Sequence, residues 1–365
     1  MSAAGQPAGR SRWGELILLP TINLVAALLL SGLVIRLIGE SPRQALQLML
    51  AGAFGSQEAI GYTLYYATNF IFTGLAVAVA YHAGLFNIGA EGQAYIGGLG
   101  VGLVGLVGGN WPFWLVLPAA IVAAAAFGAA WAFIPAWLQA RRGSHIVITT
   151  IMFNFLASAL MTWLLVNILI KPGQQSPETR EFGAGAWLPT AQSLLGRIGL
   201  TVAASPLNLA FLLALGAAGL VWAIIWHTRW GYALRVTGEN PSAALYAGIA
   251  PPAVMLLAML ASGALAGGLG LNELMGVQHR ISLDFPAGAG FVGIAVALMG
   301  RNHPLGICLA AILFGALMQG GSELSFDLPH VTRDMVVVIQ GLVILFCGAL
   351  QNVFRARLRR LGLNL

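Results

Sequence analysis

The chain has 365 residues, of which 58% are hydrophobic and only 8% charged, whereas about a quarter of the residues in a soluble domain are charged. Apolar runs of roughly 20 residues recur from end to end, so the composition indicates an all-α, polytopic membrane protein. The net charge is +6, but the arginines are scattered over loops and termini instead of gathering with aromatic residues, which argues against nucleic acid as a partner.

The first half of the chain is expected to contain five membrane helices. Arg10 and Arg12 precede the first apolar run, and no small-residue cleavage site follows it, so this run is interpreted as a retained helix and not a signal peptide. An interrupted segment at 84–93 separates the second helix from the third. The expected helices cover about 15–36, 60–82, 94–108, 113–138 and 146–170.

The second half begins with a polar stretch, 171–206, and is expected to add five helices, at about 207–227, 251–272, 288–300, 305–320 and 335–353. About ten spans place both termini on one side of the membrane. The Arg141-Arg142 pair and the four tail arginines indicate that this side is cytoplasmic. No stretch is polar and long enough for a soluble domain, so residues 1–365 are expected to form a single membrane domain.

Two interrupted segments, near 84–93 and near 270–290, carry polar residues at membrane depth. The first contains Asn87, Glu91 and Gln93 among several glycines, and the second contains Asn272 and Glu273. Unpaired backbone groups and carboxylates cost several kcal/mol in hydrocarbon, so such segments must line a cavity or pack inside the bundle. Paired interruptions in the two halves of a chain are typical of a transporter binding site.

Asn69 and Asn154 lie inside the helices at 60–82 and 146–170 and are further candidates for a substrate path. The alternative for every one of these residues is a helix–helix hydrogen bond, which contributes only about 0.6–2 kcal/mol in membranes. Both interpretations stay open for Asn69 and Asn154, whereas a carboxylate at Glu91 favours a role in the path.

Several chemistries are excluded by absent motifs. The sole lysine, Lys171, has no glycine-rich phosphate loop around it, so the chain cannot be its own ATPase. The histidines are dispersed, and Cys308 and Cys347 lie in apolar runs without metal-ligand or disulfide spacing. We therefore expect no enzyme activity, no metal site and no cofactor in this chain.

The polar loop at 228–249 is a second signal. Asn240-Pro241 is suited to begin a short helix, with Pro241 in its first turn. Ala243, Ala244 and Ala247 would give it a small-residue face that another protein could approach closely. An ordinary solvated connector is the alternative for this loop.

Four blocks of the sequence, at 84–98, 144–154, 228–249 and 290–304, resemble permease subunits of ABC importers for nucleosides and simple sugars, and they follow one another in the order that this family has. Their closest likeness is to the nucleoside-type branch of the ribose/branched-chain amino acid permease superfamily, because the run from Phe86 to Gln93 differs from the ribose branch. The first helix and 171–206 do not contribute to the likeness.

The resemblance implies an inner-membrane permease with four kinds of partner: an ATP-binding subunit that holds the ATP, a second permease subunit in a heterodimer, an extracytoplasmic substrate-binding lipoprotein, and membrane lipid. The loop 228–249 would seat a short helix in a groove of the ATPase, so that a bulky residue at Gly238 would block docking. The coupling residues implied are Gly231, Arg235, Gly238, Glu239, Asn240, Ala243, Ala244 and Gly248.

The rival hypothesis is a secondary transporter of small polar solutes that is driven by an ion gradient. Such a protein needs no ATPase partner, but it needs membrane-buried acids that couple to protons or sodium. Only Glu91 and Glu273 could serve in that role.

Overall fold

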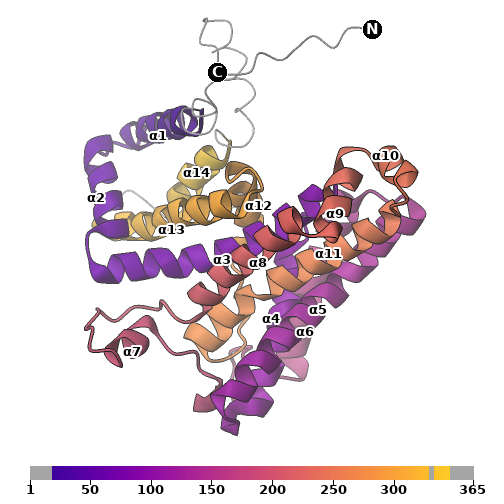
Figure 1. The fold of residues 1–365 in the computed structure, drawn as a ribbon. Coiled ribbons are helices and arrows are strands. Elements are labelled where there is room, and N and C mark those ends of the chain that lie inside the picture. The colour runs from indigo at the N-terminus through magenta and orange to yellow at the C-terminus, as the bar shows by residue number, and fades with distance from the viewer. Residues whose placement is uncertain (1–18, 329–332, 346–365) are drawn as a thin grey trace, which may run out of the picture. The chain divides into compact units, whose positions relative to one another are not determined.

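The computed structural model describes residues 19–328 and 333–345, and Figure 1 shows them as a helical protein. The all-α expectation is confirmed for these residues, whose only β pairing is an isolated bridge between Thr190 and Asn208. The chain divides into two compact units, 1–52 with 320–365, and 53–319. That residues 1–365 form a single functional domain stays a prediction. Arg10, Arg12, Cys347 and the tail arginines lie outside the described residues.

The first unit contains α1 (Leu19–Leu37), most of α2 (Pro42–Phe54), the end of α13 (Pro304–Asp327) and α14 (Arg333–Ile344). Helix α2 was missed in the sequence, where this stretch reads as a mixed loop. It forms because Pro42 is preset for a first helical turn and the Ser41 hydroxyl accepts a hydrogen bond from the Gln44 amide (3.4 Å).

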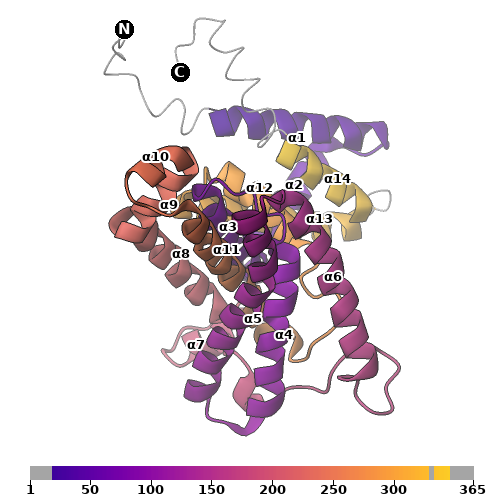
Figure 2. The ribbon, with the colours of Figure 1, turned by 90° about the vertical axis from the view of Figure 1, so that its right-hand side faces the viewer.

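The second unit holds the remaining helices around a buried pair, α3 (Gln57–His82) and α4 (Ala90–Val107). Helices α5 (Phe113–Arg142) and α11 (Pro251–Gly267) pack along α4, as Figure 2 shows. The unit is completed by α6 (Ile146–Asn167), α7 (Ala191–Gly196), α8 (Ala210–His227), α9 (Arg229–Glu239), α10 (Pro241–Tyr246), α12 (Ala289–Met299) and most of α13.

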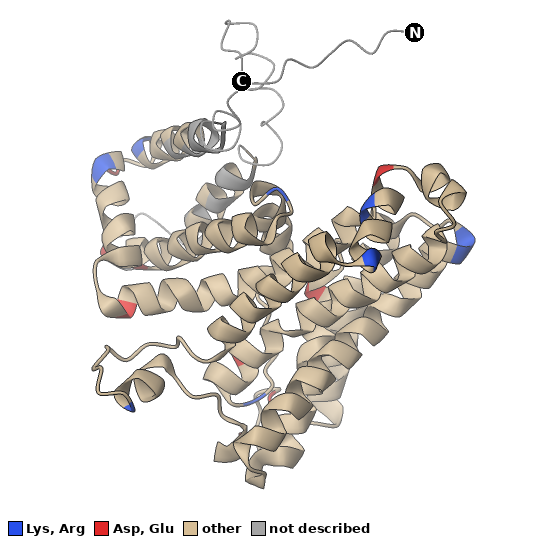
Figure 3. Ribbon diagram, viewed as in Figure 1, with Lys and Arg blue, Asp and Glu red and all other residues tan. Residues whose placement is uncertain are grey.

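Seven helical segments of the described residues are long and apolar enough to cross a membrane, so the protein is multi-pass. The expectation of about ten spans is not confirmed. Helix α12 has only 11 residues, and part of the expected last span lies outside the described residues. Charged residues lie mainly at helix ends and in loops (Figure 3). The seven segments are Gln57–His82, Ala90–Asn110, Phe113–Arg142, Ile146–Asn167, Ala210–His227, Pro251–Gln278 and Pro304–Ser325.

Glycines bring α4, α5 and α11 into backbone contact. A Cβ atom on Gly97 would overlap the Cα atom of Gly267, and one on Gly128 would overlap the carbonyl of Gly263. Gly270, just after α11, approaches Gly98 in the same way, since a Cβ atom on Gly270 would overlap the Cα atom of Gly98. The side chains of Phe285 and Ile281, from the loop before α12, pack closely on Gly98 and Gly102.

Candidate functional site

The first interruption separates α3 from α4. Asn87 is fully buried in this break, where its Oδ1 atom accepts a hydrogen bond from the Gly89 amide (2.8 Å). Its Nδ2 atom donates to Oε1 of Gln93 and to the hydroxyl of Ser262 on α11, both at 2.8 Å. Ser262 in turn donates to the Ala76 carbonyl of α3 (2.6 Å). The predicted pair Asn87 and Gln93 therefore ties three helices together.

Glu91 is the second residue of α4, and it joins the first interruption to the start of α12. Its two carboxylate oxygens accept hydrogen bonds from the backbone amides of Gly288 (2.8 Å) and Gly290 (2.6 Å). These amides belong to the start of α12, whose first N–H groups have no partner within the helix. A carboxylate there is stabilised by the helix macrodipole as well. Glu91 therefore caps α12 from a distant part of the sequence.

The second interruption is a π-helix, Leu271–Gln278, which follows α11. Glu273 is buried in it and accepts three hydrogen bonds. The Tyr65 hydroxyl and the Asn69 amide of α3 both donate to its Oε1 atom (2.6 Å each), and Gln278 donates to its Oε2 atom (3.2 Å). π-Helical turns occur frequently at functional sites.

Asn272 extends the same cluster. Its Nδ2 atom donates to Oδ1 of Asn69 (2.9 Å) and to the Tyr65 carbonyl (3.1 Å), and its Oδ1 atom accepts from Asn208 (2.9 Å). The structure therefore brings Asn69, Asn272 and Glu273 together, as a shared site requires. Tyr65 and Asn208 were missed. Tyr65 lies four residues before Asn69 and so on the same helix face, which was a usable signal.

Asn154 of α6 contacts the first interruption separately. Its Oδ1 atom accepts from the Gly92 amide and its Nδ2 atom donates to the Ile88 carbonyl, both at 2.9 Å. All seven predicted path residues thus make hydrogen bonds within the chain in this conformation. They fall into three groups, which are Asn87 with Gln93 and Asn154, Glu91 with α12, and Asn69 with Asn272 and Glu273.

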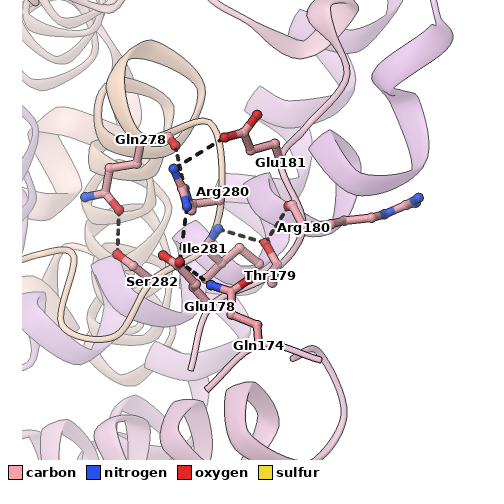
Figure 4. Close-up of polar contacts among 9 residues, drawn as sticks. All are labelled: Gln174, Glu178, Thr179, Arg180, Glu181, Gln278, Arg280, Ile281 and Ser282. Atoms are coloured by element: carbon pink, nitrogen blue, oxygen red, sulfur yellow. Dashed lines mark hydrogen bonds and ion pairs between the residues drawn. The ribbon is translucent and has the colours of Figure 1, made fainter. Parts of the chain in front are cut away.

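A loop between α6 and α8 is fastened to the residues that follow the π-helix (Figure 4). Arg280 forms ion pairs with Glu178 (3.1 Å) and Glu181 (3.4 Å). The Thr179 amide donates to the Ile281 carbonyl (3.0 Å), and the Ile281 amide donates back to the Thr179 hydroxyl (3.0 Å). This loop had given no specific signal in the sequence.

His279 ends the π-helix with a left-handed backbone (φ 53°). Its ring stacks on Trp187 of the same loop, with ring centroids 4.1 Å apart and planes 13° from parallel. Burial lowers the pKa of His279 below its ordinary value, outweighing the Met275 carbonyl and Glu181, which act to raise it. The neutral imidazole is therefore the form that the stack favours.

At the other end of α8, Asn240 begins the short helix α10, as the sequence predicted. Its Oδ1 atom accepts hydrogen bonds from the amides of Ser242 (3.0 Å) and Ala243 (3.1 Å), and Pro241 occupies the first turn. Ala244 is fully buried, so the expected small-residue face is partly turned inward. The large apolar side chains exposed on α10 are Leu245 (63%) and Tyr246 (96%), which the sequence interpretation missed.

Gly238 lies on the inner side of α9. A Cβ atom there would overlap the His82 carbonyl, and one on Gly84 would lie 3.3 Å from the Cα atom of Gly238. The backbone of α9 thus lies directly against the backbone at the start of the first interruption. A bulky residue at Gly238 would clash with the His82 carbonyl inside this chain before it reached any partner. A loss of transport is therefore still expected from such a residue, but the expected cause is displacement of α9 and not a direct block of ATPase docking.

The other residues predicted to couple to an ATPase either pack within the α8–α9–α10 segment or lie exposed on it. Gly231 packs against the carbonyls at the end of α8, its amide donates to the Thr228 hydroxyl (3.0 Å), and its carbonyl accepts from Arg235 (3.4 Å). Gly248 follows α10 with φ 75°, while Glu239 and Ala243 are exposed. A cavity of about 560 Å³ beside α9 is lined by residues that include Gly84, Arg235, Gly238 and Glu239.

Residues 59–348 match the family described as the branched-chain amino acid transport system / permease component. The chain is 33% identical over 351 residues to the guanosine ABC transporter permease protein NupP of Bacillus subtilis, covering 95% of this chain and 98% of that protein. The chain belongs to this permease family. It is also similar to the glucose permease protein TsgB13 of Haloferax volcanii (34%; 90% and 86% covered) and the nucleoside permease protein NupB of Lactococcus lactis (32%; 90% of each).

The protein is therefore a permease subunit of an ABC importer, and the resemblance seen in the sequence is confirmed. Members of this family are transport components and not enzymes. Because ABC importers are driven by ATP, membership of this family argues against the rival hypothesis of a transporter driven by an ion gradient. The matched region of the permease contains all three hydrogen-bonded groups and α9–α10, and it begins after α1 and α2.

Proposed function

We propose that this permease subunit forms the translocation path for nucleosides, with simple sugars as the alternative substrate class. Two of the relatives described above have guanosine or nucleosides in their names, and one has glucose. The observation that carries the proposal is the gathering of amides and carboxylates at two interrupted membrane segments. Amide and carboxylate groups are the natural partners of ribose hydroxyls and base edges.

The path residues proposed are Asn69, Asn87, Glu91, Gln93, Asn154, Asn272 and Glu273. Each now bonds another part of the chain, so substrate can reach them only if those bonds are exchanged. We assign the present arrangement to a closed state of the path. ATP-driven motion would then shift the population toward a state in which these groups face substrate.

Helix α10 is the proposed contact with the ATP-binding subunit, which holds the ATP; this chain needs no cofactor or metal of its own. Leu245 and Tyr246 are exposed there and suit an apolar groove in the partner. Motion of α10 would pass to α9 and, through the Gly238–Gly84 contact, to the first interruption.

The proposed topology has both termini cytoplasmic and about ten spans in the inner membrane. Helix α5 ends at Arg141-Arg142, and α6 and α8 cross once each, so α9–α10 share the side of these arginines. The loop 168–209 would then face a substrate-binding lipoprotein outside. A second permease subunit is expected because Bacillus subtilis has two guanosine permease proteins, NupP and NupQ, that both match this chain.

The test is uptake of labelled nucleosides, with ribose and glucose as comparisons, in cells holding the complete importer with or without this chain. We expect nucleoside uptake that requires the chain and stops on ATP depletion while the ion gradients are maintained. Uptake of sugars alone would move the permease to the sugar class. Uptake of neither class would contradict the proposal.

A further inference from the structure

We propose that Arg280 is a positioning residue for transport, which holds Glu273 in its closed arrangement by linking it to the loop 174–190. This inference rests on the function proposed above, because it assigns Glu273 to the substrate path. Nothing in the sequence had pointed to Arg280, to Glu178 and Glu181, or to the loop itself.

The first step is the fastening of the loop to the chain after the π-helix. Beyond the two ion pairs of Arg280, the Phe182 amide donates to the His279 carbonyl (2.7 Å) and the Leu188 amide donates to the Met275 carbonyl (2.8 Å). Figure 4 shows Glu178 and Glu181 converging on the Arg280 guanidinium from the loop. A displacement of the loop must therefore displace 279–282.

The second step leads from Arg280 to Glu273 through Gln278. The Gln278 carbonyl accepts from Nε of Arg280 (3.4 Å), and its side-chain Oε1 accepts from the Ser282 hydroxyl (2.5 Å). Its Nε2 atom donates to Glu273 (3.2 Å). Gln278 lies one π turn after Glu273, so both side chains project from the same side of the helix. The amide is thus oriented from both ends, and its donor faces the carboxylate.

The third step concerns the strength of this link. The side chains of Arg280, Glu178 and Glu181 are 37%, 20% and 64% exposed, so the ion pairs form in partly aqueous surroundings. Such pairs contribute little to stability and exchange readily. The fold therefore does not depend on these ion pairs. The balance between the closed and open arrangements of Glu273 does depend on them, because a small free-energy difference is enough to shift a two-state population.

The experiment uses the complete importer, with its ATPase subunit, second permease and binding protein, in proteoliposomes. The readout is substrate transported per ATP hydrolysed. We expect Arg280→Glu to lower this ratio about fivefold, because loss of a partly exposed ion pair shifts a two-state equilibrium by about that factor. Arg280→Lys keeps the positive charge and should stay near wild type. The swap Arg280→Glu/Glu178→Arg should restore part of the ratio, because it rebuilds one ion pair with reversed charges, while the contacts to Glu181 and to the Gln278 carbonyl stay lost.

The matched control is Arg197→Glu. Arg197 is an exposed arginine just after α7 and forms no ion pair with a described residue. A loss in this control equal to that of Arg280→Glu would overturn the proposal, as would a swap that restores nothing or an Arg280→Glu importer with the wild-type ratio. Failed assembly of Arg280→Glu that the swap does not repair would also overturn it, because Arg280 would then be structural.

A second readout separates this inference from the proposed function. Amide hydrogen exchange of residues 271–278 should become about fivefold faster in Arg280→Glu and return toward wild type in the swap. This measurement needs no substrate. If the wild-type importer moved neither nucleosides nor sugars, the proposed function would be wrong. The hydrogen-exchange measurement would still show whether Arg280 is linked to the π-helix.

Discussion

Single residues fasten the interrupted segments, and Glu91 is the clearest case because its carboxylate accepts two backbone amides of a distant helix. Hydrogen bonds to a charged acceptor contribute about 1.5–3 kcal/mol. We expect Glu91→Ala to lower uptake at least severalfold while the chain still inserts in the membrane. Glu91→Gln, which keeps one acceptor oxygen, should retain more activity. Uptake is to be compared at equal amounts in the membrane, and wild-type uptake in Glu91→Ala would contradict the assignment.

Gly238 offers a second test at this scale. Gly238→Leu should abolish ATP-dependent uptake, because a side chain there pushes α9 away from the His82 carbonyl and separates it from Gly84. The control is Gly219→Leu, since a Cβ atom on Gly219 of α8 meets nothing within 4 Å. Copurification of the ATPase subunit shows whether docking persists. Normal uptake by Gly238→Leu would mean that this contact does not transmit motion.

At the scale of elements, α10 depends on its cap. The helix has only six residues, so it cannot persist on intrinsic propensity alone. Asn240→Ala should cost about 1 kcal/mol and reduce copurification of the ATPase subunit, and Asn240→Asp should restore it. The control is Ser242→Ala. Ser242 is exposed in the first turn of α10, and it is its backbone amide, which the substitution keeps, that bonds to Asn240. Unchanged copurification in Asn240→Ala would show that α10 is not the docking element.

The π-helix and its loop should respond to pH through His279. Burial lowers its pKa, so the neutral form is favoured in the fold and protonation as the pH falls opposes the stack on Trp187. Glu181 favours protonation and Arg280 opposes it. The protection factors of the amides at 182–188, which correct for the slower intrinsic exchange at low pH, should therefore fall between about pH 7 and about pH 5. His279→Asn, which tolerates the left-handed backbone, should lose this dependence. Equal pH dependence in the variant would contradict the interpretation.

The elements show which features sequence reasoning can reach. Helix α10 was predictable because Asn240-Pro241 is a local signal, and the two interruptions were predictable because glycines and polar residues break apolar runs. The hydrogen bond between Asn69 and Glu273 was not predictable, because it joins residues that are 204 positions apart in the sequence. Helix α2 was missed because its polar residues mask a good first turn at Pro42. Arg280 was missed because its partners come from a loop without periodicity.

For the whole molecule, the proposed topology can be tested by labelling. Helix α8 has 18 residues and so spans about 27 Å between the loop that contains Ile198 and the corner that contains Tyr246. Both side chains are exposed. In a background without the native cysteines, Tyr246→Cys should react only with a reagent applied from the cytoplasm, and Ile198→Cys only from outside. Reaction of both from one side would refute the topology.

The glycine contacts among α4, α5 and α11 decide where the permease can bend. Side chains that interdigitate can change rotamer and let helices slide, but backbone packed on backbone at Gly97–Gly267 and Gly128–Gly263 has no such freedom. We infer that these three helices travel as one rigid body during each cycle. Rotation would then fall to the two stretches that flank it, 83–89 and 268–288. Three of the seven proposed path residues, Asn87, Asn272 and Glu273, lie in these two stretches, so the same residues would meet substrate and carry the bending.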